Sequence, residues 1–302
     1  MAALAAIYVI WGSTYLAIKY ALESFPPFLM MGARSLAAGL ILYLWSRSRG
    51  EERARKEHVV PIVVIGVLFF LVGHGLLAWA QQKVPSGLAA LLVASEPLWI
   101  AVIEAFLIRD DKATSRTIFG LILGFAGLSL LFAPGDKLGS QHLDSLSVFA
   151  VLLGTISWSL GAVYSRMAKL PRSPILSAGL ELIVGGFLLV ACGLFFGEGE
   201  QLRWSAVTPR SILGLVYLIL FGSVITFTAY VWLLSITSAT RVATHTYVNP
   251  VIAVFLGWAV ASEALSLQIF LVTIIIVISV YLVLGQKKRA LPPLRPRLIP
   301  TD

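Results

Sequence analysis

Two stretches decide the fold: residues 86–107, SGLAALLVASEPLWIAVIEAFL, and residues 239–260, ATRVATHTYVNPVIAVFLGWAV. Each is mostly apolar and has the length of about 20 residues that crosses a ~30 Å hydrocarbon layer. Each also carries a polar residue followed by proline near its middle, Glu96-Pro97 and Asn249-Pro250. Because proline removes one backbone donor and leaves a carbonyl without its partner, the two stretches predict membrane helices that break near mid-depth.

The rest of the chain has the same apolar character. Hydrophobic residues make up 58% and charged residues 13% of the sequence, with a mean hydropathy of +0.90, whereas an ordinary soluble domain is about 25% charged. Apolar runs between short charged islands predict helices over residues 3–22, 27–46, 60–80, 86–107, 114–133, 146–168, 175–197, 211–235, 239–260 and 266–285. The fold class is therefore an all-α membrane protein with ten transmembrane helices.

The net charge of +8 is distributed by loop. If the N-terminus is cytoplasmic, the cytoplasmic loops and the C-terminal tail contain most Lys and Arg residues, and the opposite loops contain only Lys83, Lys137, Arg203 and Arg210. This asymmetry follows the positive-inside rule and predicts that both termini are cytoplasmic. The charge indicates membrane topology, so we expect no nucleic-acid partner. The lipid bilayer is the expected environment.

An internal repeat relates the two halves of the chain. A shift of about 147 residues, and later of about 153, aligns Trp11 with Trp158, Lys19 with Arg166, Gly32 with Gly179, Arg34 with Glu181, Gly39 with Gly186, Pro97 with Pro250 and Asp110 with Glu263. Because each half has an odd number of spans, the second half must enter the membrane upside down, as in secondary transporters with inverted repeats. Chance matching of Gly- and Leu-rich helices is the alternative explanation.

The expected division is a first five-helix repeat over residues 1–133, an inter-repeat loop over 134–145, a second, inverted repeat over 146–286, and a basic, disordered cytoplasmic tail over 287–302. Arg34 and Glu181 occupy equivalent positions in the repeats. Counted at 1.5 Å per residue, however, they lie roughly 10 Å apart in height. We therefore expect them to have separate partners or to extend toward the membrane surface.

Four motifs resemble a known family. They are IWGSTYLAIKYALESFPPFLMMGARSLAAG (10–39), VPSGLAALL (84–92), TISWSLGAVYSR (155–166) and YVNPVIAVFLGWAVASEALS (247–266). Over nearly its full length the chain resembles EamA-type permeases of the drug/metabolite transporter superfamily, and it is most similar to bacterial inner-membrane permeases of unassigned substrate.

The resemblance implies ten helices as two inverted EamA repeats around a central cavity, with export of amino acids, related metabolites or drugs as the usual activity. It also implies a location in the bacterial inner membrane. One departure is that the related small multidrug-resistance proteins have an essential glutamate in the first helix, whereas this chain has no carboxylate before Glu23. The resemblance therefore does not imply their proton-coupled mechanism.

The mid-depth prolines mark the candidate substrate site. Glu96 and Asn249 each lie about 10 residues into their spans, which places both near the midplane at 1.5 Å per residue. Transporters build binding sites from such broken helices at the repeat interface. We expect Glu96, Pro97, Asn249 and Pro250 to line a cavity, although the prolines could instead only kink the helices for packing.

Ionisable residues inside the membrane are functional candidates by default. Arg241, His245 and Asn249 are spaced four apart, so a continuous helix would place them on one face, with Arg241 at the cytoplasmic mouth. An anionic or zwitterionic ligand could use this face. His245 with Glu96 is a candidate for proton coupling, because histidine titrates near neutral pH; a plain hydrogen bond between helices is the alternative.

Aromatic and polar side chains complete the predicted cavity. Trp11 and Trp158 lie deep in their helices, Tyr15 is one turn from Trp11, and Trp99 is one turn from Glu96. His74, between two glycines, and Tyr230, on one face with Ser223 and Thr226, could also line the cavity. Such a cavity suits aromatic, apolar or cationic groups. Core packing, and for the hydroxyl groups bonding back to their own helix, explain these residues equally well.

The sequence lacks the motifs that would indicate the main alternatives to secondary transport. A membrane-embedded enzyme would need a motif such as HExxH or GxSxG, and an ATP-driven pump would need a phosphate loop of the GxxxxGK type; the sequence contains none of the three. A receptor or assembly subunit without flux remains compatible with the sequence. With a single cysteine, Cys192, we expect no disulfide and no cysteine-based metal site. We expect a monomer with a small-molecule substrate and no cofactor.

Overall fold

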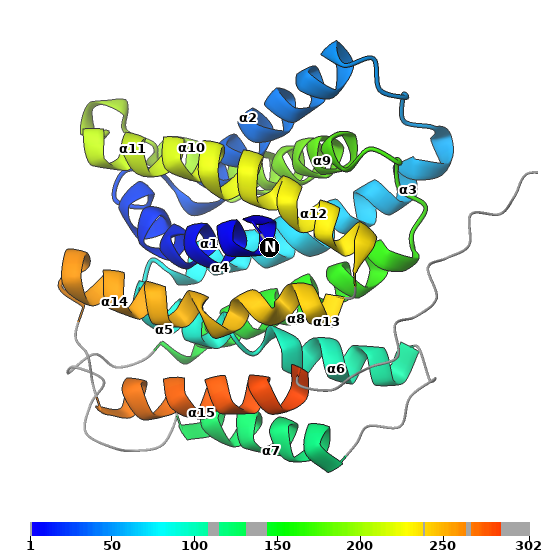
Figure 1. Cartoon of the computed structure of the whole chain (residues 1–302). Helices are drawn as coiled ribbons and strands as arrows, with labels where there is room; N and C mark the ends of the chain where they lie inside the picture. Colours follow the sequence, from blue (N-terminus) through cyan, green and yellow to red (C-terminus); the bar gives the residue numbers. More distant parts are fainter. Residues whose placement is uncertain (1, 108–114, 131–143, 238, 264–266, 285–302) are drawn as a thin grey trace, which may run out of the picture.

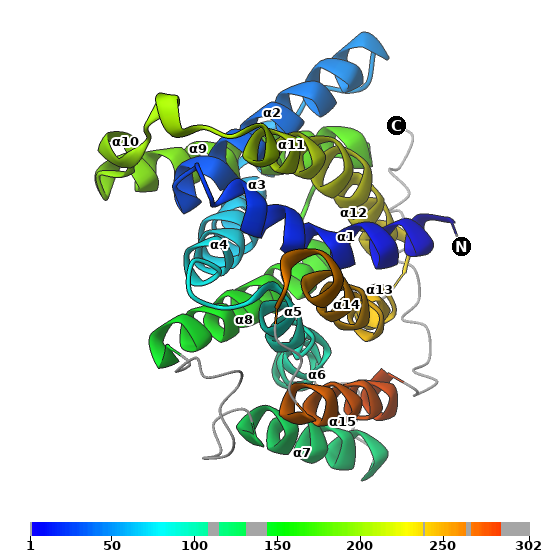
Figure 2. The same ribbon diagram turned by 90° about the vertical axis from the view of Figure 1, so that its left-hand side faces the viewer.

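The structure is a computed structural model that describes residues 2–107, 115–130, 144–237, 239–263 and 267–284. These residues form helices joined by short loops, and no strand occurs among them. The axes of most helices are roughly aligned. In Figure 1, α2 lies at one edge of the bundle, and α7 and α15 lie at the opposite edge. A view from the side shows the same order (Figure 2). The prediction of an all-α fold is confirmed.

The first half follows the predicted spans closely but contains interruptions. Its elements are α1 (Ala2–Ala21), α2 (Pro27–Ser48), α3 (Lys56–Ile65), η1 (Gly66–His74), α4 (Gly75–Ala80), α5 (Ser86–Val93), α6 (Glu96–Leu107) and α7 (Ser115–Leu130). The elements α3, η1 and α4 form one continuous helix whose middle part, η1, is a π-helix. The sequence predicted this span without the wider turns.

The second half repeats this pattern. Its elements are α8 (Ser145–Met167), α9 (Pro174–Phe195), α10 (Glu198–Gln201), η3 (Trp204–Ala206), α11 (Pro209–Tyr217), η4 (Leu218–Ile225), α12 (Thr226–Ile236), α13 (Ala239–Val242), η5 (Ala243–Tyr247), α14 (Asn249–Ala261) and α15 (Leu267–Leu284). Here η4 is again a π-helix in the middle of a long helix, and η5 is a 3₁₀ segment. Residues 134–143 of the predicted inter-repeat loop and the predicted tail lie outside the described residues.

The predicted breaks occur at the two prolines. α5 ends at Val93, a turn follows, and α6 restarts at Glu96 with Pro97 as its second residue. In the second half α14 begins at Asn249, again with proline second. Proline fits the first turn of a helix because the amide groups there have no intrahelical acceptor. Each polar residue therefore stands at the beginning of a half-helix.

Seven helical stretches of the described chain are long and apolar enough to cross a membrane: Ala3–Ala21, Pro27–Ser48, Lys56–Ala80, Ser86–Leu107, Ser145–Met167, Pro174–Phe195 and Pro209–Ile236. Shorter apolar helices cover Ser115–Gly127 and Leu267–Leu282, and α14 is also short. The outer surface carries large apolar side chains, among them Phe106, Phe187 and Phe255. This arrangement suits a chain in contact with lipid.

Equivalent elements of the two halves make equivalent contacts. α2 packs against α9 and α7 packs against α15, while α1 contacts α14 in the way that α8 contacts α6. Glycines allow the closest of these approaches. A Cβ atom on Gly39 of α2 would lie 2.8 Å from the carbonyl oxygen of Gly179 and 2.8 Å from the amide nitrogen of Ile183, both in α9. The backbones of α2 and α9 are thus in direct contact.

An acidic side chain from the second half caps a helix of the first half. α2 starts at Pro27 after the N-cap residue Pro26, and because proline has no amide hydrogen the first free amide groups are those of the next residues. Glu198 accepts hydrogen bonds from the amides of Phe28 (3.2 Å) and Leu29 (2.8 Å). A carboxylate at a helix N-terminus also interacts favourably with the helix dipole. Burial raises the pKa of Glu198, and these two hydrogen bonds oppose that rise.

Candidate functional site

A central cavity lies between the two halves. The empty space between its lining residues is about 620 Å³, a figure that includes open space at its mouth. Seven of the residues predicted to form the substrate site line it: Trp11, Tyr15, His74, Glu96, Trp158, His245 and Asn249. They come from α1, η1, α6, α8, η5 and α14. Residues more than 200 positions apart in the sequence, such as Trp11 and Asn249, meet here because both halves surround one space.

Trp11 and Trp158, which align in the internal repeat, meet at the cavity. Their rings are 5.8 Å apart at an interplanar angle of 83°, an edge-to-face contact. The indole of Trp11 donates to the carbonyl oxygen of Gly222 (3.1 Å), and that of Trp158 donates to the hydroxyl of Tyr230 (3.0 Å). Because their N–H groups are occupied, these rings offer apolar faces and edges to a ligand.

Glu96 and His245 form a buried pair. Both are 2% exposed, and Glu96 Oε2 lies 3.6 Å from His245 Nε2. The other ring nitrogen, Nδ1, lies 2.9 Å from the carbonyl oxygen of Val242, so it carries a proton in the tautomer that this contact selects. The other carboxyl oxygen, Glu96 Oε1, is buried and has no hydrogen-bond partner among the residues that the structure describes. The pair thus has room for a proton between Nε2 and Oε2 and an unused oxygen beside it.

The predicted continuous face of the ninth span is wrong in detail. Residues 243–247 form the 3₁₀ segment η5, so residues four apart no longer share one face there. His245 and Asn249 still line the cavity. With its side-chain amide turned so that its hydrogen bonds are made, Asn249 donates to the carbonyl oxygens of His245 (3.1 Å) and Tyr8 (2.9 Å). Arg241 belongs to α13, but its side chain lies outside the described part of the structure.

Four residues predicted to line the cavity are placed elsewhere. Trp99 donates to the hydroxyl of Ser95 (3.1 Å) and packs against Phe125 of α7, and these contacts hold its ring outside the lining residues. Tyr230 is buried behind the wall, where it contacts both deep tryptophans. Pro97 and Pro250 shape the backbone breaks but are not among the lining residues.

The structure adds Arg34 to the cavity wall. Two outcomes were predicted for Arg34, a partner of its own or extension toward the membrane surface. Arg34 has a partner: it is 2% exposed, and its Nε donates to the hydroxyl of Ser223 in η4 (2.8 Å). Glu181 has a different partner, since its Oε1 accepts a hydrogen bond from Ser177 (3.0 Å).

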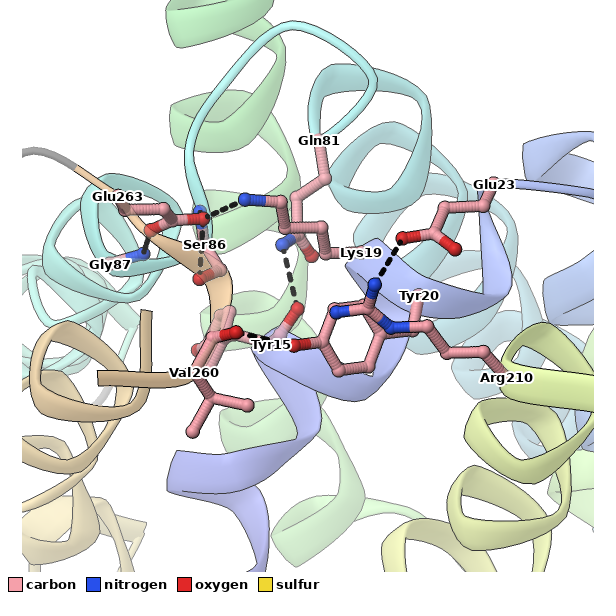
Figure 3. A network of polar contacts seen from close by, with 10 residues as sticks. All are labelled: Tyr15, Lys19, Tyr20, Glu23, Gln81, Ser86, Gly87, Arg210, Val260 and Glu263. Atoms are coloured by element: carbon pink, nitrogen blue, oxygen red, sulfur yellow. Dashed lines mark hydrogen bonds and ion pairs between the residues drawn. The ribbon is translucent and has the colours of Figure 1, made fainter. Parts of the chain in front are cut away.

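Sequence reasoning missed a polar network that joins one end of α1, α5 and α14, which we call the Glu263 network (Figure 3). Glu263 Oε1 lies 2.9 Å from Lys19 Nζ and accepts from the amide and the hydroxyl of Ser86, each at 2.9 Å. Its Oε2 accepts from the amide of Gly87 (3.1 Å). Glu263 therefore caps α5 and also pairs with Lys19 of α1. Lys19 lies one helical turn after the cavity residue Tyr15.

A second contact at the same end joins α1 to α11. Arg210 lies over the ring of Tyr20, with 3.6 Å between its guanidinium carbon and the ring centroid, and 3.7 Å from Glu23. The hydroxyl of Tyr20 donates to the carbonyl oxygen of Val260 (3.2 Å) (Figure 3). These contacts hold this end of the bundle together.

Comparison with known proteins gives the family. The model of the EamA-like transporter family matches residues 1–133 and 145–285. This chain belongs to the EamA-like transporter family. The resemblance seen in the sequence is thereby confirmed, and the chain is a membrane transporter.

Relatives of this EamA-like transporter carry similar names. The chain is 35% identical over 283 residues to the uncharacterized inner membrane transporter YedA of Escherichia coli strain K12, covering 93% of this chain and 89% of that protein. It is 28% identical over 286 residues to the uncharacterized transporter YvbV of Bacillus subtilis strain 168, covering 94% and 91%. A solved structure titled "Crystal structure of protein" shares the fold, with a TM-score of 0.68, 20% identity and coverage of 93% and 95%.

The Glu263 network of this EamA-like transporter predicts a pH-dependent stability. Burial raises the pKa of Glu263, but hydrogen bonds from Lys19, Ser86 and Gly87 together outweigh this rise. The pKa of Glu263 is therefore below the ordinary 4.5. A carboxylate with a lowered pKa stabilises the fold above the ordinary value, and this stabilisation is lost as pH falls through the lowered pKa. Glu263→Gln should therefore cost about 1–3 kcal/mol at neutral pH and less under acid conditions.

Thermal unfolding in detergent, from neutral pH down to pH values below the ordinary pKa of a glutamate, measures the stability that Glu263 contributes. Glu200→Gln is the matched control, because Glu200 is exposed on α10. The difference in melting temperature between wild type and Glu263→Gln should narrow with acidification, while the control follows wild type throughout. An equal difference at every pH would show that the charge of Glu263 contributes nothing.

Proposed function

We propose that this membrane transporter is a secondary transporter that exports small organic metabolites, such as amino acids, related compounds or drugs, by alternating access. The observation that carries the proposal is the cavity between the halves, where the broken helices bring Glu96 and Asn249 to one space with His245. The names of relatives such as YedA support a multi-pass location in a bacterial inner membrane. Both halves of one chain line the cavity, so we take the monomer as the transporting unit.

Ten transmembrane helices in two inverted repeats, residues 1–133 and 146–286, form the proposed architecture. Several features support it. Equivalent elements pack in equivalent pairs, both halves contain a π-helical segment in the third span, and Trp11 contacts its repeat equivalent Trp158. The short helices α7, α14 and α15, together with the seven longer stretches, would supply the ten spans. Such repeats let one packing arrangement serve both sides of the membrane.

Alternating access needs a closure that opens and closes on each side of the cavity. With both termini cytoplasmic, as the loop charges predict, the Glu263 network lies at the outer end of α1, α5 and α14. In the proposed cycle these hydrogen bonds hold the outer side closed and break when the cavity opens outward. Hydrogen bonds to a charged group contribute about 1.5–3 kcal/mol each, so a transporter can exchange them on the timescale of transport.

The Glu96–His245 pair is the proposed site of proton coupling. The lone pair of His245 Nε2 faces Glu96 Oε2 at 3.6 Å, and without a proton between them the two acceptors would repel each other. We propose that the pair holds one proton in the closed cavity and exchanges it when the cavity opens to the other side. Release of substrate on that side would then be linked to proton uptake.

An untargeted comparison of exported metabolites tests the proposed function. Cells that express the wild-type chain should release at least one organic compound several-fold faster than cells expressing Glu96→Ala. Glu52→Ala, at an exposed carboxylate in the loop between α2 and α3, should behave as wild type. Equal profiles for all three chains, with equal amounts of protein in the membrane, would contradict an exporter that uses this cavity.

A further inference from the structure

Arg34 is a buried cation at the cavity without a charged partner. No carboxylate oxygen of the described residues lies within 4.0 Å of its guanidinium nitrogens. Its strong hydrogen bond is the one from Nε to Ser223, and Nη1 makes only a long contact of 3.6 Å with the sulfur of Met31. Since a guanidinium has five N–H donors, Arg34 retains donors for a ligand.

The surroundings of Arg34 hold its side chain in place. Ser223 fixes Nε from η4, and the neighbouring Gly222 has no side chain where Nη2 lies, since a Cβ there would be 3.1 Å from it. The carbonyl oxygen of Gly222 is already occupied by the indole of Trp11. The hydrogen bond to Ser223 and the contact with Met31 hold the guanidinium at the cavity that Arg34 lines.

His74 is a second polar residue that lines this cavity. It lines the cavity with Arg34, and its Nδ1 is buried without a hydrogen-bond partner among the described residues. The ring packs against Trp158 with centroids 4.9 Å apart, which fixes its plane. A buried polar atom without a partner is costly and calls for an explanation such as an absent ligand.

We propose that Arg34 and His74 bind the carboxylate of an organic substrate whose apolar or aromatic part packs against Trp11 and Trp158. This inference rests on the proposed transport cavity and names the class of substrate. The carboxylate accepts two parallel hydrogen bonds from the fork of Arg34, the geometry that guanidinium groups favour, and a third from Nδ1–H of His74. Binding pairs a buried charge that is otherwise uncompensated.

The charges of the cavity favour a monoanion. Arg34 is the one Lys or Arg among the described lining residues, and Glu96 adds an acidic group to the same wall. Inorganic phosphate is a mixture of monoanion and dianion near neutral pH, and its dianion would lack a second fixed cation. The tryptophan rings also offer apolar contacts that an inorganic anion cannot use.

Binding to the purified full-length protein in lipid nanodiscs tests the proposal. The ligands used are phenylacetate, phenylacetamide, phenethylammonium and inorganic phosphate, and the signal is tryptophan fluorescence, since Trp11 and Trp158 line the cavity. Phenylacetate should bind at least tenfold more tightly than the other three. Arg34→Gln should weaken phenylacetate at least tenfold, and Arg34→Lys should give an intermediate loss because lysine keeps the charge but lacks the fork.

Arg49→Gln is the matched control, because Arg49 lies at the end of α2 over Trp45, away from the cavity; it should bind phenylacetate as wild type does. Equal affinities for phenylacetate and phenylacetamide, or an unchanged affinity in Arg34→Gln, would overturn the proposal. If Arg34→Gln does not fold, the four ligands on wild type and the Arg34→Lys variant decide. Phenylacetate binding without flux of any compound would overturn the proposed transport instead, whereas flux of compounds lacking a carboxylate would overturn only this inference.

Discussion

Glu96→Gln should abolish accumulation driven by a proton gradient in reconstituted vesicles, with a loss of at least tenfold. Glutamine keeps the size of the side chain but cannot bind or release a proton, so the pair with His245 loses its exchangeable group. Exchange of substrate across the membrane without a gradient should persist, because the cavity keeps its shape. The substrate is the compound identified from the export profiles.

The measurement compares uptake with and without an imposed pH gradient, together with counterflow at equal pH. Glu52→Gln serves as the control, since this exposed carboxylate lies in a loop and should leave gradient-driven uptake unchanged. If gradient-driven uptake through Glu96→Gln equals that of wild type, Glu96 has no part in coupling. Loss of both gradient-driven uptake and counterflow would assign Glu96 to substrate binding alone.

Gly39→Val should cause a large loss of stability although it leaves the charge unchanged. A Cβ on Gly39 would lie 2.8 Å from two backbone atoms of α9, which cannot move aside as a flexible side chain can. Overpacking a well-packed interior costs about 1–3 kcal/mol, and here the cost should reach the upper end because the whole α2–α9 contact must widen. The folded yield and the melting temperature should both fall.

Gly199→Val is the control for this substitution. Its Cβ would meet only the end of the Leu194 side chain, at 3.3 Å, and Gly199 is exposed on α10. Size-exclusion profiles and thermal melting of the two variants in the same detergent measure the difference. A Gly39→Val protein that melts as wild type does would show that α2 and α9 separate without cost.

The sequence predicted the features that depend on local chemistry. Apolar runs set the helix positions to within a few residues, and the prolines after Glu96 and Asn249 marked the helix breaks, because a missing backbone donor acts wherever it occurs. The internal alignment also identified Trp11 and Trp158 as a pair. It did not predict that their rings meet, since this depends on how the halves pack.

Features that depend on side-chain direction were not predicted. Contacts with Ser95 and Phe125 hold Trp99 outside the lining residues, and η5 changes the spacing after Arg241; counting along a continuous helix misses both. Arg34 was assigned a depth but not a neighbour. The Glu263 network did leave a signal: Lys19 aligns with Arg166 and Glu263 with Asp110, so two basic and two acidic positions repeat together. Asp110 lies outside the described residues.

The π-helical segments η1 and η4 allow the long helices to rearrange locally without unfolding. A π-turn contains one residue more than an α-helical turn needs, and moving that surplus residue along the helix exchanges hydrogen-bond acceptors one at a time. No amide then loses its acceptor within lipid, where such a loss costs several kcal/mol. η1 ends at His74 and η4 contains Ser223. A shift of the extra residue along either helix would therefore rotate the His74 or Ser223 side chain about the helix axis, while both ends of that helix keep their positions.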